Sequence, residues 1–189
     1  MGNSESRRKA ASDRQKQIRI KPASPAQTGD GNPKFVADVM LGRLAKWLRI
    51  AGFDVLYSNK FSDDELIEIS NREDRVLLSR DTRLLIRKPV TKFLFLETQE
   101  IQSQIRQVFR SMSILELEFP LTRCLSCNDI LMEANRESVR SRVPAFVYNT
   151  QSHFKSCPKC GKIFWAGTHR NAVVCTLNKL LSETLDSRA

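Results

Sequence analysis

The spacing of apolar residues changes repeatedly between residues 34 and 120. Short apolar runs typical of buried strands occupy residues 34–38, 54–57, 75–79 and 92–96. Several of the segments between these runs place apolar residues three and four positions apart, which is the spacing of one helical face. Alternating strands and helices predict an α/β fold, in which a mostly parallel sheet is flanked by helices on both faces. Functional residues are then expected at the carboxyl ends of the strands.

Three helices are predicted from this spacing. Their apolar faces are formed by Leu41, Leu44, Ala45 and Leu48, by Leu66, Ile67 and Ile69, and by Ile101, Ile105, Val108 and Met112. Gly52 ends the first helix. Ser62 and Glu65 have the spacing of a capping box, which predicts the start of the second.

Four cysteines form two C-x-x-C pairs, and each pair is followed by a turn-forming residue. The pairs are Cys124 with Cys127 and Cys157 with Cys160. This spacing places four thiolates within reach of one tetrahedral Zn²⁺. Two disulfides are the alternative, but they need an oxidising compartment, and the chain shows no apolar signal segment. The fifth cysteine, Cys175, lies in an apolar stretch and is expected to be buried and inert, the alternative being a reactive thiol.

The composition divides the chain into four segments. Residues 1–33 are rich in Ser, Pro, Gly, Lys and Arg, which predicts a disordered basic tail. Residues 34–120 form the α/β domain, 121–176 the zinc module, and 177–189 a C-terminal helix and tail. The first six residues loosely fit an N-myristoylation pattern. An unstructured electrostatic arm or a targeting peptide are the other readings of this tail.

The net charge of +10 is unevenly distributed. Basic residues outnumber acidic ones by 8 to 3 in residues 1–34 and by 10 to 5 in residues 121–189, whereas residues 35–120 hold 13 of each. Basic flanks suit a polyanionic partner such as RNA, although they also serve solubility. No apolar run approaches the length of a transmembrane segment, so we expect an intracellular, cytoplasmic protein.

Aspartates stand where the predicted strands end or helices begin. Asp38 follows the first strand, Asp63 and Asp64 open the second helix, and Asp81 follows the third strand. Carboxylates that converge at one edge of a sheet favour Mg²⁺ or Mn²⁺, which can activate water and stabilise charge on a phosphate. Each aspartate also has a structural explanation as a turn or helix-capping residue.

Basic and aromatic residues supply candidates for RNA contacts. Arg43, Lys46 and Arg49 recur every three residues on the first helix, opposite its apolar face, and Arg80 precedes Asp81. A solvated helix face is the default interpretation, and phosphate contacts are the functional one. In the zinc module most aromatic residues are expected in the core. Trp165 is the best candidate for base stacking, and His169 either contacts phosphate or caps the module.

Several longer motifs together resemble one family, the Mut-seven C-terminal RNase domain, a PIN-like fold joined to a zinc ribbon. The motifs are FVADVMLGRLAKWLR at residues 35–49, VLLSRD at 76–81, RCLSCN at 123–128, CPKCG at 157–161 and FWAGTH at 164–169. They occur in the family's order, and the resemblance covers about residues 34–175.

This resemblance implies a PIN-like endoribonuclease that uses Mg²⁺ or Mn²⁺. Asp38 matches the family's first-strand aspartate, and Asp63 matches the one that opens the second helix, with Asp64 as its alternate. Asp81 matches the aspartate of a threonine-or-serine, arginine, aspartate signature. Two other functions stay open: a non-catalytic RNA-binding protein on a PIN-like scaffold, and a protein-interaction module that docks partners through the zinc ribbon.

Overall fold

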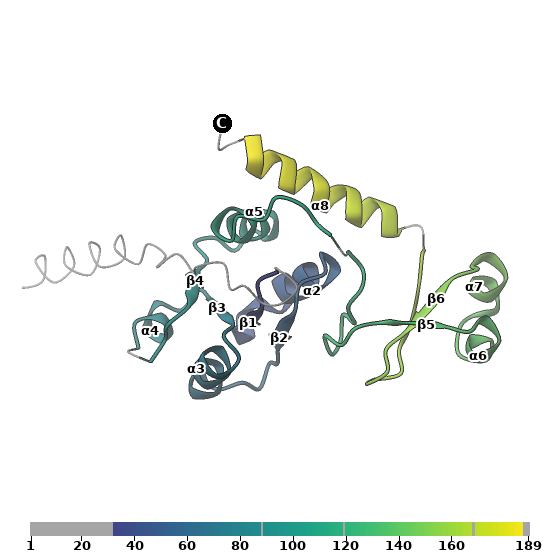
Figure 1. The fold of residues 1–189 in the computed structure, drawn as a ribbon, viewed down its shortest axis with the longest axis horizontal. Coiled ribbons are helices and arrows are strands. Elements are labelled where there is room, and N and C mark those ends of the chain that lie inside the picture. Colours follow the sequence, from purple (N-terminus) through teal and green to yellow (C-terminus); the bar gives the residue numbers. More distant parts are fainter. Residues whose placement is uncertain (1–31, 88, 119, 168, 187–189) are drawn as a thin grey trace, which may run out of the picture.

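The computed structural model describes residues 32–87, 89–118, 120–167 and 169–186. The predicted basic tail and the acylation pattern fall almost wholly outside these ranges. Figure 1 shows an α/β domain and a smaller antiparallel sheet, joined by an extended segment and by the last helix. Within the described ranges, no helix has the length and apolar character needed to cross a membrane.

The first sheet contains four parallel strands in the order β2-β1-β3-β4. The strands are β1 (Phe35–Ala37), β2 (Val55–Tyr57), β3 (Val76–Ser79) and β4 (Phe93–Phe95). Val36 pairs with Leu56 on one side and Leu77 on the other. All four strands lie within the predicted apolar runs, so the parallel α/β architecture is confirmed.

Helices cover both faces of this sheet because successive strand residues point to opposite sides. Phe35 and Ala37 face a core with 3-10 helix η1 (Val39–Leu41) and helices α2, α5 and α8, whereas Val36 and Leu77 face α3 and α4. The helices are α2 (Gly42–Ile50), α3 (Asp63–Arg72), α4 (Thr82–Leu85), α5 (Ile101–Ser111) and α8 (His169–Asp186). Figure 1 shows the two layers on either side of the strands.

Local signals set several of the helix ends. The Ser62 side chain accepts from the Glu65 backbone N–H, and the Glu65 side chain accepts from the Ser62 N–H, so the predicted capping box starts α3. Gly52 has φ of 101°, which ends the α2 segment as expected. Position 42, the first residue of α2, needs a glycine, because a Cβ there would lie 2.6 Å from the Tyr57 hydroxyl. That hydroxyl donates to the Val39 carbonyl at 2.9 Å.

The second sheet is antiparallel, with strand order β5-β6-β7. Its strands are β5 (Met132–Ala134), β6 (Phe154–Ser156) and β7 (Ile163–Trp165). Two short helices, α6 (Arg136–Val139) and α7 (Ala145–Thr150), lie between β5 and β6 and were not predicted. This sheet carries the second C-x-x-C pair in the connection between β6 and β7.

The last helix returns to the first domain. It begins at residue 169, earlier than the predicted helix around residues 177–185, and its buried residues Leu177, Leu181 and Thr184 lie on one face. Figure 1 shows α8 lying along α5, where Arg106 donates to Glu183 at 2.9 Å. Cys175 lies away from that buried face and is exposed, so the expectation that it is buried is wrong.

A polar junction fastens the first cysteine pair to the edge strand β2. Arg49, only 3% exposed, donates to the Val55 carbonyl at 2.8 and 3.0 Å and to the Leu125 carbonyl at 2.9 Å. The Val55 N–H donates to the Asn128 side chain at 2.9 Å. Arg49 therefore does not face solvent as predicted, because its partners lie outside its own helix, on β2 and in the first cysteine pair.

Asp54 extends this junction to β3. Its carboxylate accepts from Arg75 at 2.6 Å and from the Asn128 amide at 2.7 Å. Burial acts to raise the pKa of Asp54, but these two hydrogen bonds and the charges of Arg75 and Arg123 together hold the pKa below its usual value. The charged carboxylate thus stabilises the contact between the sheet and the cysteine pair.

Replacing this carboxylate tests the junction. We expect Asp54→Asn to lower the free energy of unfolding by about 2 kcal/mol, because hydrogen bonds to a charged group are lost. Because folding lowers the pKa of Asp54, its carboxylate makes its full contribution to the free energy of unfolding above the unfolded-state pKa of about 3.9. This contribution disappears only as the pH falls through the pKa of the folded state. The decrease in the free energy of unfolding caused by Asp54→Asn should therefore be equal at pH 7 and pH 8, measured by urea unfolding of zinc-loaded protein. Asp186→Asn, at an exposed position, is the control.

Candidate functional site

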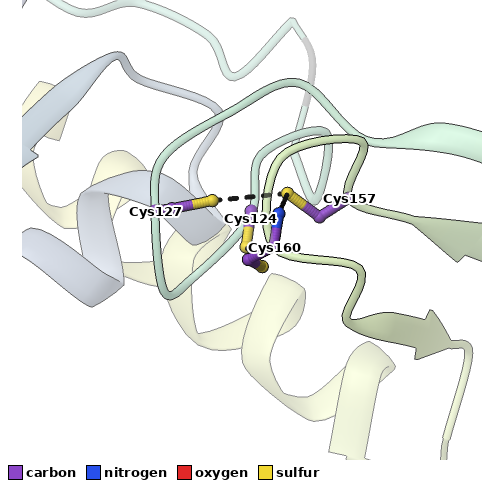
Figure 2. Close-up of side chains that lie close together, drawn as sticks. All are labelled: Cys124, Cys127, Cys157 and Cys160. Carbon is purple, nitrogen blue, oxygen red and sulfur yellow. Dashed lines mark hydrogen bonds between the residues drawn. The ribbon is translucent and has the colours of Figure 1, made fainter.

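The four predicted cysteine ligands come together in one cluster. Their sulfur atoms all lie within 4.8 Å of one another, and among the described residues this is the only group of three or more His, Cys, Asp or Glu side chains with such geometry. Figure 2 shows the two pairs facing each other. The close sulfur contacts cross between pairs, at 3.6 Å for Cys124 with Cys160 and 3.3 Å for Cys127 with Cys157.

The two pairs have the same backbone geometry. The Cys124 carbonyl accepts from the Asn128 N–H, and the Cys157 carbonyl accepts from the Gly161 N–H, each at 2.9 Å. Asn128 and Gly161 both have φ of 71°, which Gly and Asn adopt most readily. The turn-forming residues after each pair therefore close two equivalent knuckles, as their positions in the sequence indicate.

The sulfur geometry fits a tetrahedral metal site. Zn–S bonds of about 2.3 Å place neighbouring sulfurs about 3.8 Å apart, whereas a disulfide bond measures about 2.05 Å. All four cysteines are free thiols. Burial acts to raise the pKa of Cys157, but the Cys160 N–H and the Cys127 side chain lower it to about 7. Four soft ligands in this arrangement can hold a metal such as zinc.

Arg49 also acts on the charge of this centre. Four thiolates and one Zn²⁺ carry a net charge of −2, and the guanidinium of Arg49 donates to the Leu125 and Ser126 carbonyls inside the first knuckle. Burial lowers the pKa of Arg49, while the charges of Cys124 and Cys127 oppose that shift. A buried cation beside the knuckle offsets part of the anionic charge of a loaded centre.

Two of the predicted aspartates meet at the carboxyl edge of the parallel sheet. Asp38 follows β1 and is only 5% exposed, and its carboxylate accepts from the Ser79 hydroxyl at 2.5 Å. The same hydroxyl oxygen accepts from the Asp81 N–H at 2.9 Å. Ser79 thus links Asp38 to Asp81. The Asp81 side chain itself accepts from the Arg83 N–H and caps α4.

The other two aspartates lie on the first turn of α3. Asp63 and Asp64 are both exposed, and Asp64 forms an ion pair with Arg87. Within the described ranges, no three carboxylates form a group as close as that of the cysteines. The structure therefore joins Asp38 and Asp81 through Ser79 but does not place Asp63 or Asp64 in a compact three-carboxylate centre with them.

Basic side chains line a cavity of about 180 Å³ beside this edge. Arg43 and Arg80 both contribute to it, and the Nε atom of Arg80 is buried without a hydrogen-bond partner. Gln99 and Gln104 also line it and were not predicted, although the place of Gln99 in the segment that follows β4 is a usable signal. Lys46, one turn beyond Arg43, is exposed as expected.

The aromatic residues of the zinc module divide into core and surface. Phe154 is buried, whereas Trp165 is 40% exposed, as expected for a stacking candidate. Phe146 on α7 is 76% exposed, although most aromatic residues of this segment are predicted to pack in the core. His169 is the first residue of α8, and its side chain lies outside the described part of the structure.

Metal analysis tests the cysteine centre directly. We expect purified protein to carry one zinc ion per chain, and Cys127→Ser to lose most of it because one of four thiolates is removed. Cys175→Ser is the matched control, since this exposed thiol lies outside the cluster. Elemental analysis after gel filtration measures both. A full equivalent of zinc in Cys127→Ser would contradict the four-cysteine assignment.

Comparison with known proteins agrees with both features of this geometry. A family model described as the Mut7-C RNAse domain matches residues 33–177, which include the parallel sheet and all four clustered cysteines. Neither the curated proteins nor the solved structures contain a match. With most of its length matched by this model, the chain belongs to the Mut7-C RNAse domain family.

Proposed function

We propose that this protein is a metal-dependent ribonuclease whose site lies at the carboxyl edge of the parallel sheet. The observation that carries the proposal is the link from the Asp38 carboxylate through the Ser79 hydroxyl to the backbone N–H of Asp81, in a chain of the Mut7-C RNAse family. The reaction would be endonucleolytic hydrolysis of an RNA phosphodiester bond. Family membership supports RNA as the substrate.

Asp38 has the properties of a cation ligand. Its carboxylate is nearly buried, and a buried negative charge is costly unless a partner or a cation compensates it. Ser79 occupies one of its oxygens through a hydrogen bond. Mg²⁺ and Mn²⁺ need only one or two protein carboxylates, and they supply activation of water and neutralisation of phosphate charge when bound. Asp81 is the second proposed ligand, and Asp63 or Asp64 would complete the set.

Arg43 and Arg80 are suited to hold the phosphates on either side of the cut. Both line the cavity beside the acidic edge, and the unpaired, buried Nε of Arg80 still has a hydrogen bond to donate. Lys46 extends the positive surface along α2. Guanidinium groups bind phosphate oxygens in pairs of hydrogen bonds, which positions a backbone without reading its sequence.

The cysteine centre is proposed as a structural zinc site in a ribbon that also contacts RNA. Its ligand set is closed with four thiolates, which is typical of structural rather than catalytic zinc. Four reduced thiols favour an intracellular compartment.

One observation favours a second function, a non-catalytic RNA-binding protein. The Asp81 carboxylate caps α4, and Asp64 is paired with Arg87, so both have structural roles that need no cation. This alternative keeps the basic surface and the ribbon but gives no cleavage with any divalent metal.

Cleavage of labelled single-stranded RNA distinguishes the two functions. We expect Mn²⁺- or Mg²⁺-dependent products from wild-type protein. Asp38→Asn and Asp81→Asn should each reduce the cleavage rate at least about 100-fold, because charge at the proposed metal site is lost. Asn can still cap α4 at position 81, so the fold is retained.

Asp186→Asn is the control, because this exposed aspartate lies at the end of α8, outside the acidic edge. Equal cleavage by the wild type and both edge variants would rule out the proposed site. RNA binding without products in every metal would support the non-catalytic alternative.

A further inference from the structure

A second cavity lies between the zinc ribbon and the first domain, and nothing above gives it a role. It measures about 740 Å³, and we call it the ribbon groove. Its lining residues come from the end of α2, the segment before and after the first knuckle, the ribbon sheet and α8, and include Ile50, Leu125, Leu131, Phe164, Trp165 and Val173. Most of the lining is apolar or aromatic.

Part of an aromatic side chain stays exposed at the groove. Trp165 at the end of β7 remains 40% exposed, although it lies in the paired sheet opposite Phe154. The Gly167 N–H donates to the Trp165 carbonyl at 3.0 Å, so the chain turns back directly after the indole. A held, half-exposed indole beside apolar side chains offers a flat planar surface suited to stacking a ring.

The polar residues at the groove are mainly basic. Arg123, Lys155 and His153 line it, together with a single acidic residue, Glu133. Arg123 is already engaged, because it donates to the Gly52 and Asn128 carbonyls and lies 3.9 Å from Asp54. Lys155 lies 3.7 Å from Glu133 in an exposed pair, which contributes little free energy, so Lys155 is the cation that can turn to a phosphate. A half-exposed indole among apolar side chains, with one lysine beside it, is complementary to a ligand that has an aromatic ring and a negative charge. A nucleotide has both.

One helix face connects the groove to the acidic edge. Arg43, Lys46 and Ile50 are spaced at i, i+3 and i+7, so they lie on the same side of α2. Arg43 lines the cavity at the carboxyl edge, Lys46 is exposed, and Ile50 lines the ribbon groove. The nine residues of α2 span about 14 Å, so a single strand can follow this face between the two cavities.

From these features we infer that the ribbon groove binds unpaired bases of single-stranded RNA, with Trp165 as the stacking surface and Lys155 beside the backbone. The inference rests on the proposed function for the identity of the nucleic acid. It adds a binding site at the amino-terminal edge of the sheet, one helix length from the proposed site of cleavage. A base-paired strand cannot present its bases to such a groove, so the site selects single-stranded segments.

Fluorescence anisotropy with labelled oligonucleotides tests this inference. All proteins carry Asp81→Asn, so that the probes are not cleaved. One probe is a single-stranded, uridine-rich RNA, and the other is a strand of the same length with abasic residues in place of the nucleotides. We expect Trp165→Ala to raise the Kd for the RNA about tenfold and to leave the Kd for the abasic strand unchanged. Trp165→Phe should restore most of the affinity because it keeps an aromatic ring.

Phe146→Ala is the matched control, since this aromatic side chain is more exposed than Trp165 but does not line the groove. Zinc content confirms that each variant is folded. Equal affinity for RNA and abasic strand, or unchanged RNA affinity in Trp165→Ala, overturns the inference and leaves the groove to another occupant, such as an apolar peptide. If the wild-type protein cleaves no RNA but the binding pattern is as expected, the proposed nuclease is contradicted and the groove is not.

Discussion

The arrangement of the whole molecule depends on the hydrogen bonds that the backbone N–H and C=O of Val55 form. Val55 lies on the edge strand β2, where an unpaired N–H and C=O would invite another strand. The Asn128 side chain accepts from its N–H, and Arg49 donates twice to its carbonyl while also holding the Leu125 carbonyl. One residue of the sheet and one cysteine knuckle are therefore parts of a single hydrogen-bonded unit.

This unit and the aspartates lie at opposite edges of the parallel sheet. The knuckle docks at the amino-terminal edge of the parallel sheet, while Asp38 and Asp81 lie at the carboxyl edge, one strand length away. A metal bound at the cysteines would therefore lie away from Asp38 and Asp81. Helix α8 adds a second connection, because it leaves the ribbon and buries Leu177 and Leu181 in the core of the first domain.

Sequence reasoning succeeded where the signal was local and periodic. Apolar runs located the four parallel strands, and Ser62 and Glu65 located the start of α3, because each depends on neighbouring residues. It failed where the partner was distant. Arg49 has the spacing of a solvent-facing cation, and only its contacts with Val55 on β2 and with Leu125, 76 residues away, show that it is buried. The prediction that Cys175 is buried is wrong, because an apolar stretch alone does not indicate which face of α8 packs against the core.

Hydrogen–deuterium exchange of zinc-loaded and zinc-stripped protein tests most directly whether the knuckle and the sheet edge form one unit. The account predicts that stripping zinc raises exchange in peptides covering β2 together with those covering residues 123–128, because Asn128 and Arg49 lose their fixed positions against Val55. Increased exchange confined to the ribbon, with β2 as protected as in the loaded protein, would contradict it.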